Sequence, residues 1–266
     1  MFPTICQLGP LTIKSFGLMA ALGFIAAYAV MRRLSQKVAG LVPDAASQLM
    51  VFIMVGGALG ARFAYVAEHW SQEFAGQPFS EIFRFDKGGL MFYGGLGGAI
   101  LAIVLFSRLK RCNLVSLLDL AATVLPLGHA FGRVGCFLNG CCYGRVTSSP
   151  IGVAYPAGSN PWYEQVSEGL IAKAAAKSLP LVPSQPIEAL LNLALFAALY
   201  ALARRTGRTG LLSGVYLVAY ALIRFFTETL RSDPRMSVGS LSIAQFICLF
   251  VFAAGLAFMG FSRAKK

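Results

Sequence analysis

Long apolar stretches, separated by short polar segments, account for most of the chain. Seven of them are long enough, or nearly so, to cross about 30 Å of hydrocarbon as α-helices. Their residues do not alternate between apolar and polar positions, as the strands of a membrane barrel would. The pattern therefore predicts an all-α membrane protein, a bundle of seven transmembrane helices at residues 15–31, 48–67, 89–106, 114–132, 187–203, 211–230 and 241–261.

Composition narrows the class of protein further. Hydrophobic residues make up 57% of the 266 positions, charged residues make up only 13%, and the mean hydropathy is +0.68. A soluble domain is about half apolar and about a quarter charged, so an ordinary soluble enzyme, a disordered chain and a fibrous protein are excluded. In a membrane protein the excess of 23 Lys and Arg over 11 Asp and Glu reflects topology and anionic headgroups. We therefore expect a lipid bilayer as a partner and no nucleic acid.

The distribution of charge predicts how the chain crosses the membrane. The connections 32–47, 107–113 and 204–210 and the tail after residue 261 hold twelve basic residues and one acid, Asp44. The opposite connections hold eight basic and seven acidic residues. Because short cytoplasmic segments are enriched in Lys and Arg, we expect the N-terminus outside and the C-terminus in the cytoplasm. The first stretch lacks the basic region and cleavage site of a signal peptide, which indicates a retained helix.

The only sizeable connections, 68–88 and 133–186, are expected on the outer side, and we interpret the second as a cap on the bundle and not as a second domain. We expect residues 1–266 to form a single polytopic membrane domain, with residues 133–186 as a small external cap and a short amphipathic helix near 168–178. The small-xxx-small spacing that lets transmembrane helices approach closely occurs at Gly56/Gly60 and Gly94/Gly98. Packing is the expected role of these glycines.

Polar side chains gather at one expected depth in the bilayer. An ionisable group inside a membrane is expensive and needs a specific role. When each helix is followed in its predicted direction at 1.5 Å per residue, five helices bring such groups to the outer leaflet. These groups are Lys14, Arg62, Tyr93, His129, Arg133, Arg224, Glu228 and Arg231. Their convergence predicts a site near the outer surface.

Arginines at headgroup depth suit an anionic ligand. An arginine binds phosphate through two parallel hydrogen bonds, and the natural anion at this depth is a phospholipid headgroup. Arg224, Glu228 and Arg231 share one helix face, although the first two could instead form a structural ion pair. Arg62 could likewise snorkel to the surface or pair with Glu68.

His129 precedes Arg133 by one helical turn. A neighbouring guanidinium disfavours a second positive charge, so the imidazole could accept a proton. The alternative is a histidine at a helix end that is bonded to a carbonyl group.

Three of the six cysteines, Cys136, Cys141 and Cys142, lie close together in the sequence. On the outer face a disulfide from Cys136 to either of the others is chemically allowed, and packing as small apolar residues in a glycine-rich turn is the alternative. Tetrahedral zinc would need a fourth ligand, and the spacing is not that of a paired CxxC site. The sequence contains no CxxC redox motif.

A longer pattern surrounds these cysteines, Gly132-Arg133-Val134-Gly135-Cys136-Phe137-Leu138-Asn139-Gly140-Cys141-Cys142-Tyr143-Gly144-Arg145. It resembles the signature of the prolipoprotein diacylglyceryl transferase family, approximately G-R-x-G-N-F-x-N-G-E-x-x-G-R. Shorter matches follow in order along most of the chain, at Gly9-Pro10-Leu11, Phe16-Gly17-Leu18-Met19, Gly60-Ala61-Arg62, Gly89 to Leu96, Pro183-Ser184-Gln185 with Glu188, and Arg224-Phe225 with Glu228 and Arg231.

The resemblance implies a multi-pass enzyme of the bacterial inner membrane. Such enzymes move the diacylglyceryl group of phosphatidylglycerol to the lipobox cysteine thiol of a preprolipoprotein, which forms a thioether and releases glycerol 1-phosphate. The resemblance implies no metal and no organic cofactor. Carried over by position, Arg133 and Arg224 would be the principal catalytic and headgroup-binding arginines, and Arg62 and Arg231 would also bind substrate. The site would be shaped by Asn139, Gly140, Gly144 and Glu228.

The chain departs from the family pattern at several functional positions. Tyr93 stands where the family usually has a histidine that could act as the thiol base, and an ordinary tyrosine is a poor base at pH 7 because its pKa is about 10. Cys136 and Cys141 replace the usual asparagine and glutamate, and Phe16 replaces a tyrosine. We hypothesise that His129, or ionisation of the substrate thiol beside the arginines, takes over the role of the missing histidine.

Three other functions remain compatible with the sequence. A paralogue could use the same lipid donor with another acceptor. A non-catalytic lipid-binding or transport protein could use the same scaffold, although transporters bind near the midplane and often contain inverted repeats. A membrane thiol oxidoreductase would depend on Cys136, Cys141 and Cys142, whereas a transferase would tolerate their replacement by serine.

Overall fold

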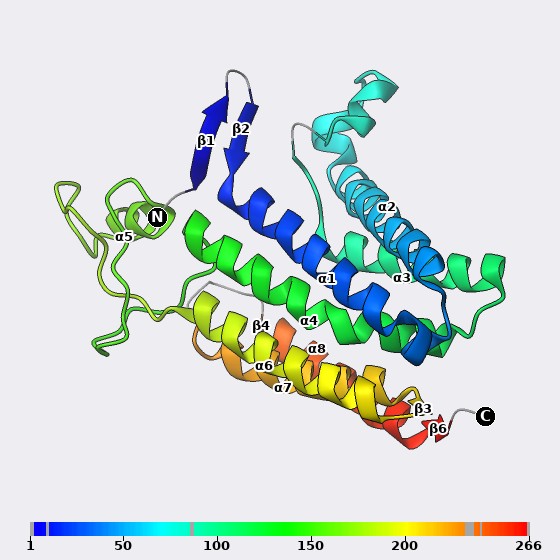
Figure 1. Cartoon of the computed structure of the whole chain (residues 1–266). Helices are drawn as coiled ribbons and strands as arrows, with labels where there is room; N and C mark the ends of the chain where they lie inside the picture. Colours follow the sequence, from blue (N-terminus) through cyan, green and yellow to red (C-terminus); the bar gives the residue numbers. More distant parts are fainter. Residues whose placement is uncertain (1–2, 9–10, 86–87, 232–236, 240, 265–266) are drawn as a thin grey trace. The chain divides into compact units, whose positions relative to one another are not determined.

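All seven predicted spans are helices in the computed structural model, which describes residues 3–8, 11–85, 88–231, 237–239 and 241–264 (Figure 1). Each helix is long and apolar enough to cross a membrane. Two residues of the family resemblance, Gly9 and Pro10, lie outside the described residues. The seven spans are α1 (Ser15–Ala39), α2 (Pro43–Glu68), α3 (Phe92–Lys110), α4 (Leu114–Asn139), α6 (Ser184–Arg205), α7 (Leu211–Glu228) and α8 (Ile243–Gly260). The fold is therefore that of a multi-pass, all-α membrane protein, and the side on which each terminus lies stays a prediction.

The chain divides into two compact units. Unit 1 comprises Met1–Val30 and Ala121–Lys266, and unit 2 comprises Met31–Leu120. Helices α1 and α4 each begin in one unit and end in the other. The expectation of one polytopic domain over residues 1–266 stays a prediction.

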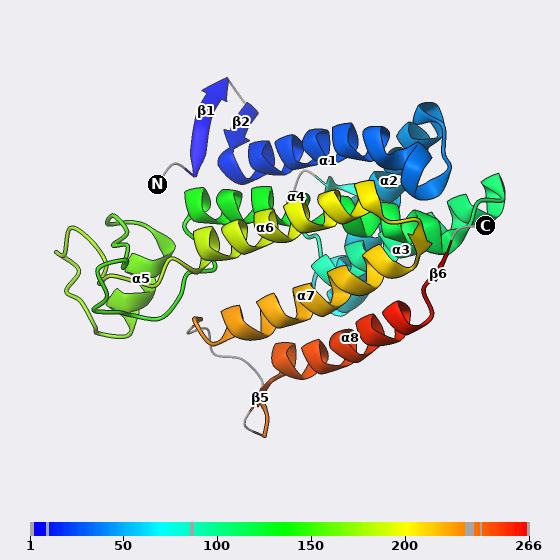
Figure 2. The same cartoon turned by 60° about the horizontal axis from the view of Figure 1, so that its bottom comes forward.

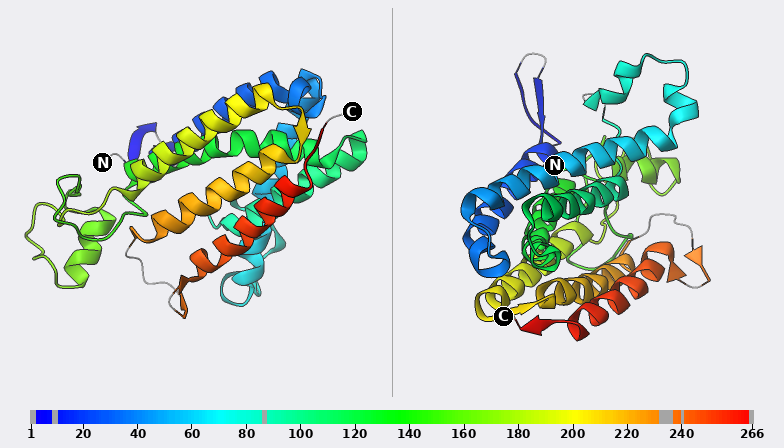
Figure 3. Two further views of the ribbon diagram at one scale, coloured as in Figure 1. Left: turned by 90° about the horizontal axis from the view of Figure 1, so that it is seen from below. Right: turned by 90° about the vertical axis from the view of Figure 1, so that its right-hand side faces the viewer.

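Unit 2 is built on close packing of α2 against α3, which lie side by side in Figures 1 and 3. A side chain at Gly56 would lie 2.6 Å from the Ala102 methyl group and 2.8 Å from the Gly98 carbonyl oxygen. A side chain at Gly60 or Gly94 would meet the other helix just as closely. The predicted packing role of the four glycines is confirmed. After α2 the chain forms a π-helical turn (Trp70–Phe74) and a 3₁₀ turn (Phe79–Phe83).

In unit 1, α7 packs against both α6 and α8, and the three helices run alongside one another in Figures 2 and 3. Gly214 of α7 faces Gly255 of α8, where a side chain would come within 2.9 Å of the opposite carbonyl oxygen. Helix α8 begins with a capping box between Ser242 and Gln245. Gly135 of α4 leaves room for Phe16 of α1, whose Cδ2 atom would be 3.1 Å from an added side chain.

Short antiparallel strand pairs complete the described structure and were not predicted from the sequence. The hairpin of β1 (Thr4–Leu8) and β2 (Leu11–Lys14) leads directly into α1, so Lys14 is the last strand residue before the helix. The other pairs are β3 (Arg208–Thr209) with β6 (Arg263–Ala264), and β4 (Ser237–Val238) with β5 (Leu241–Ser242).

The predicted cap is a loop region with one short helix. Of residues 133–186, the first seven belong to α4 and the last three to α6. The helix of the cap is α5 (Asn160–Ser167), so the prediction of a helix near 168–178 was wrong. Hydrogen bonds from distant residues hold that segment in an irregular conformation. The Trp162 indole donates to the Ala175 carbonyl (2.7 Å), and the Ala157 amide donates to the Ala176 carbonyl (3.0 Å).

Candidate functional site

Four charged side chains from three helices of unit 1 form a cluster in which the two carboxylates are buried and the two arginines are partly exposed. Arg133 of α4 donates through Nε to Oε2 of Glu188 on α6, at 2.6 Å. Arg224 of α7 pairs with Glu228 one turn later, with Nη2 2.7 Å from Oε2, and its Nη1 lies 3.8 Å from Oε1 of Glu188. Glu188 therefore lies between the two arginines, and the cluster contains two positive and two negative groups. We call it the charge cluster.

The pairing leaves hydrogen-bond donors of both arginines available. The Glu188 side chain is only 4% exposed, whereas those of Arg133 and Arg224 are 24% and 17% exposed. In the described part of the chain, the Nη1 atom of Arg224 and the Oε1 atom of Glu188 have no hydrogen-bond partner. Arg133 contacts Glu188 through Nε, and its two terminal nitrogens take no part in this ion pair. Its two terminal nitrogens can therefore form the parallel pair of bonds that suits a phosphate.

Neutral side chains surround the charge cluster and fix its members. Asn192, one turn after Glu188, is buried and donates to the Glu188 carbonyl at 2.8 Å. His129 lies beside the Asn192 side chain, and its ring centroid is 5.4 Å from that of Tyr220. On the other side, the Ser242 hydroxyl donates to Oε1 of Glu228 at 3.1 Å. These contacts make the cluster part of the helix packing.

The signature segment includes the C-terminal end of α4, which forms a Schellman motif. The Gly140 amide donates to the Phe137 carbonyl at 3.2 Å, and the Cys141 amide donates to the Cys136 carbonyl at 3.1 Å. Gly140 has φ +73°, the left-handed conformation that this motif requires and that glycine adopts without strain. The motif characteristically brings the side chains at the positions of Cys136 and Cys141 into contact. The glycine of the signature therefore places two cysteines together.

Gly144 fixes the other end of this turn. Its amide donates to the Val182 carbonyl at 2.9 Å, and its backbone pairs with that of Arg231 after α7. An added side chain would lie 2.6 Å from the Leu230 carbonyl oxygen and 2.8 Å from the Val182 side chain. Only glycine fits here. The pairing brings Arg231, the second basic residue of the predicted Arg224, Glu228 and Arg231 face, beside the signature turn.

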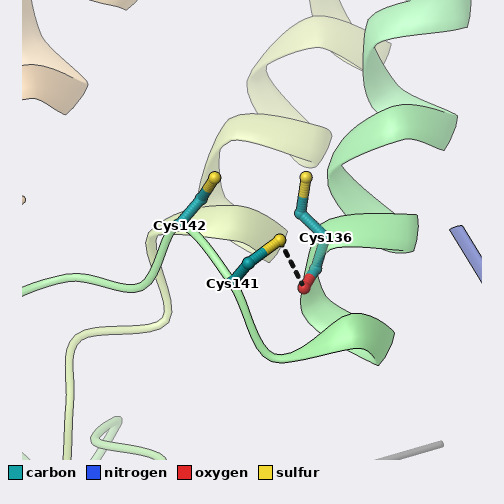
Figure 4. A group of neighbouring side chains, drawn as sticks. All are labelled: Cys136, Cys141 and Cys142. Atoms are coloured by element: carbon teal, nitrogen blue, oxygen red, sulfur yellow. Dashed lines mark hydrogen bonds between the residues drawn. The ribbon is translucent and has the colours of Figure 1, made fainter. Parts of the chain in front are cut away.

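Three cysteine thiols meet within the turn (Figure 4). The Sγ atoms of Cys136, Cys141 and Cys142 all lie within 4.8 Å of one another, and all three cysteines are free and partly exposed. The Cys141 thiol donates to the Cys136 carbonyl at 3.7 Å. Hydrogen bonds from the two neighbouring thiols, together with the positive charge of Arg231, lower the pKa of Cys142. The disulfide that the sequence allowed is absent from the structure. We call the three residues the thiol cluster.

Buried polar residues at the start of α6 hold the turn in place. The Ser184 hydroxyl donates to the Cys142 carbonyl at 2.9 Å, and the side-chain nitrogen of Gln185 donates to the Cys141 carbonyl at 2.8 Å. The same nitrogen lies 3.2 Å from the Tyr155 hydroxyl. Cys142 has φ +61°, one of two positive values among the described non-glycine residues. Such a conformation persists only where the surroundings impose it, and these hydrogen bonds do so.

The other two predicted site residues lie in unit 2. Arg62 is buried and donates four hydrogen bonds to backbone carbonyls, from Nε to Ile82 (2.7 Å), from Nη1 to Gly88 (2.8 Å) and Gly89 (3.3 Å), and from Nη2 to Glu81 (2.9 Å). It neither snorkels nor pairs with Glu68 among the described contacts. Tyr93 lies in the first turn of α3, is 69% exposed and contacts the ring of Phe92.

The structure thus brings together Arg133, Arg224, Glu228 and, beside the signature turn, Arg231. Asn139 is the last residue of α4 and lies next to the Cys141 thiol. Sequence reasoning did not assign Glu188 to the site, although it links both principal arginines. The signal was present: Glu188 and Asn192 lie one turn apart inside an apolar stretch, and such residues usually face a functional interior. Sequence reasoning did not assign Gln185 a role in the site either, because its side chain binds the backbone carbonyl of Cys141, and a contact with backbone leaves no signal in the sequence.

Comparisons with known proteins identify the family of the chain. The sequence model of the family described as "Prolipoprotein diacylglyceryl transferase" matches residues 3–261. A protein of Clostridium perfringens named "Phosphatidylglycerol--prolipoprotein diacylglyceryl transferase 2" is 34% identical over 256 residues, which cover 96% of this chain and 93% of that protein. A protein of Clostridium tetani with the same name but no number is 30% identical over the whole length of both chains. One from Nitratidesulfovibrio vulgaris is 32% identical, over 96% of this chain and 91% of that protein. The chain therefore belongs to the prolipoprotein diacylglyceryl transferase family.

Proposed function

We propose that this chain transfers the diacylglyceryl group of phosphatidylglycerol to the lipobox cysteine thiol of a preprolipoprotein. The products are a thioether-linked prolipoprotein and glycerol 1-phosphate. Membership of the family and the names of the relatives support the donor lipid and the prolipoprotein acceptor. The lipobox cysteine and the bacterial inner membrane are the finer parts of the proposal. The observation that carries it is the charge cluster.

The reaction needs a site that holds a phosphate and stabilises the charge that develops on it. The thiolate sulfur attacks the glyceryl carbon that carries the phosphate ester, the carbon–oxygen bond breaks, and the electron pair leaves with the phosphate oxygen. Preorganised donors directed at the place where charge develops stabilise such a transition state. Arg133 and Arg224 have these donors and are held by Glu188 and Glu228.

The carboxylates also explain how two arginines can remain in an apolar bundle without substrate. An unpaired buried charge is costly, whereas a paired and hydrogen-bonded one is tolerated. A phosphate of the headgroup can bind the terminal nitrogens of Arg133 while both ion pairs remain formed, whereas the Nη1 atom of Arg224 is buried beside Glu188. Arg231, Asn139, Gly140 and Gly144 would shape the wall of the same site.

Two side chains are candidates for the base that removes the thiol proton. His129 lies one turn before Arg133 on α4, close to the charge cluster. Tyr93 occupies the position at which the family usually has a histidine, and its side chain is exposed. Comparison of His129→Ala with Tyr93→Phe distinguishes them.

The experiment that tests the function uses the full chain in detergent with phosphatidylglycerol and a lipobox peptide. Release of glycerol phosphate is followed together with the mass of the peptide. We expect release that requires the peptide thiol, and a mass increase equal to one diacylglyceryl group. Arg133→Ala should abolish it, whereas Arg108→Ala, in the last turn of α3, should not. A folded protein that binds the lipid but releases nothing would contradict the proposal.

A further inference from the structure

The thiol cluster has a geometry that suits a bound metal ion. In a zinc site each Zn–S bond is about 2.3 Å, so two sulfur atoms on the same ion lie roughly 4 Å apart. The Sγ atoms of Cys136, Cys141 and Cys142 are all within 4.8 Å of one another. The observed separations are therefore close to those of three ligands on one ion. Figure 4 shows the three side chains gathered at the end of α4.

The backbone holds the three thiols in this arrangement before any ligand binds. Cys136 and Cys141 occupy the paired positions of the Schellman motif. Cys142 is held in the left-handed region by the hydrogen bonds of Ser184 and Gln185 to the turn. Metal sites need ligands positioned by such supporting contacts. A turn that served only for packing would not need a strained, non-glycine residue.

The cluster offers three ligands and no fourth. Among the described residues, no histidine, aspartate, glutamate or further cysteine joins the group. Structural zinc sites have four protein ligands, whereas catalytic sites have three and leave one position open for water or substrate. All three cysteines are partly exposed, so a small group can reach that position. Thiolate ligands select Zn²⁺ and other soft cations over Mg²⁺ or Ca²⁺.

We propose that Cys136, Cys141 and Cys142 bind one Zn²⁺ and that its open position takes the thiol of the acceptor cysteine. The proposal rests on the transferase function proposed above and adds how the nucleophile is formed. A thiol that coordinates a metal ion is deprotonated. The bound metal thus supplies the thiolate that the reaction requires. The resemblance to the family implies no metal, and this chain departs from the family signature at Cys136 and Cys141.

The step balances without an added oxidant or reductant. The acceptor thiol displaces water from Zn²⁺ and loses its proton to solvent. Its sulfur then forms a bond to the glyceryl carbon, while the bond from that carbon to the phosphate oxygen breaks. The electron pair leaves with the phosphate, which Arg133 and Arg224 stabilise. The thioether product is a weaker ligand than a thiolate, so the product dissociates from the metal.

The first measurement tests the metal site without reference to activity. The full chain is reduced, freed of metal and titrated with Co²⁺, which replaces Zn²⁺ and has visible absorption bands that report its ligands. We expect sulfur-to-cobalt charge transfer, tetrahedral bands and about one ion per chain. Binding should be lost in Cys136→Ser and in Cys142→Ser but retained in Cys112→Ser and Cys248→Ser, whose cysteines lie outside the cluster. Circular dichroism establishes that each variant folds, and failure of the folded parent chain to bind would overturn the proposal.

The second measurement tests the open position. Addition of the lipobox peptide should shift the visible bands of the cobalt protein, and a peptide with serine in place of the cysteine should not. Cobalt bound with thiolate bands but insensitive to the peptide would indicate a structural site and overturn the proposed role. This readout does not require turnover, so it remains informative if the transferase assay fails.

The third measurement is the pH dependence of turnover. A free cysteine thiol has a pKa near 8.5, so at pH 6.5 about 1% of it is ionised. The zinc-loaded enzyme should therefore exceed the metal-free enzyme by about 100-fold at pH 6.5 and by less than about threefold at pH 9. If the zinc-loaded and metal-free enzymes were both active and had the same rate as each other at pH 6.5 and at pH 9, the proposal would be overturned. The transferase function would remain intact.

Discussion

Arginines that are buried or mostly shielded from solvent have different partners in the two units of this protein. In unit 2, Arg62 donates four hydrogen bonds to backbone carbonyls and forms no ion pair among the described residues. In unit 1, Arg133 and Arg224 are paired with Glu188 and Glu228 and keep donors that no described residue uses. Arg62 and Arg224 lie in predicted spans and Arg133 directly follows one, and sequence reasoning considered an anionic headgroup as the ligand of each of them.

The difference shows that the partner of an intramembrane arginine indicates its role. A guanidinium has five N–H donors, and Arg62 uses four of them to fix the segment that follows α2. It is also surrounded by the rings of Tyr65, Phe74 and Phe85, with its central carbon 5.4–6.0 Å from the ring centroids. A carboxylate partner instead neutralises the charge through part of the guanidinium and leaves the remainder for an anionic substrate. We therefore interpret Arg62 as a positioning residue and the charge cluster as the substrate site.

The largest effect is expected from removal of the shared carboxylate. Glu188→Gln leaves Arg133 without its ion partner and weakens the field around Arg224. Breaking a buried ion pair by removing one member costs about 3–5 kcal/mol. We expect a clearly lower unfolding temperature in detergent together with loss of turnover. Thermal unfolding followed by circular dichroism provides the measurement.

Glu168→Gln is the matched control, because Glu168 is exposed and lies in the cap. The interpretation also predicts partial rescue of stability when Arg133 is neutralised in the Glu188→Gln background, since no unpaired charge then remains at that position. If Glu188→Gln were as stable as the parent chain, Glu188 would not be the centre of the cluster.

The next largest effect is expected at Arg133 itself. Arg133→Ala removes a donor directed at the phosphate, and loss of one such donor typically lowers kcat by about 100- to 1,000-fold. Arg133→Lys keeps the charge but cannot pair with Glu188 and hold a phosphate with two parallel bonds, so it should recover only a small part of the rate. Steady-state kinetics with varied phosphatidylglycerol distinguishes a change in kcat from one in KM.

A contrary outcome would be a fully active Arg133→Lys enzyme. It would show that only the charge at this position matters and that the forked geometry of the guanidinium does not. The contrast drawn between Arg62 and Arg133 would then fail, because the number of N–H donors that each guanidinium keeps available would not affect function.

The sequence was sufficient to predict the seven helices and insufficient to predict the irregular parts. A transmembrane helix is specified by the length of an apolar stretch, which is a local property. Even the fifth stretch, which contains Glu188 and Asn192, forms α6. The segment 168–178 has the composition of a helix but is not one, because the indole of Trp162 and the Ala157 amide bind its carbonyls. Such contacts between distant residues have no local signal.

The same distinction applies to the site. The proximity of Cys136 and Cys141 follows from a local rule, since Gly140 ends the helix between them. The Arg133–Glu188 pair joins two helices 55 positions apart and could not be read from spacing. Sequence reasoning identified Arg224 with Glu228 as a candidate pair because the two residues lie one turn apart. It identified which residues are costly to bury, and the structure identified their partners.

A smaller effect is expected when Arg62 is replaced by lysine. A lysine keeps the charge but is a point donor that cannot reach carbonyls in three directions. Loss of hydrogen bonds to a charged group costs about 1.5–3 kcal/mol each, and relaxation of the loop should reduce the total. We expect faster hydrogen exchange in residues 79–85 and a lower unfolding temperature, with kcat changed less than in Arg133→Ala.

This variant can reverse the interpretation of Arg62. If Arg62→Lys raised the KM for phosphatidylglycerol while residues 79–85 kept their protection against exchange, Arg62 would bind the substrate directly. Arg84→Lys is a suitable control, because Arg84 is exposed and its ion pair with Glu81 spans only three residues.

The smallest effects are expected from the two candidate bases, one in each unit. If the acceptor thiol ionises on a metal ion of the thiol cluster, neither His129 nor Tyr93 has to remove its proton. His129→Ala and Tyr93→Phe should then each lower kcat by less than about tenfold at pH 8, a smaller factor than general-base catalysis usually contributes. A fall of about 100-fold or more in one variant, deepening as the pH falls, would identify that side chain as the base. It would also show which unit supplies the proton acceptor, because His129 lies beside the charge cluster and Tyr93 lies in the unit that contains Arg62.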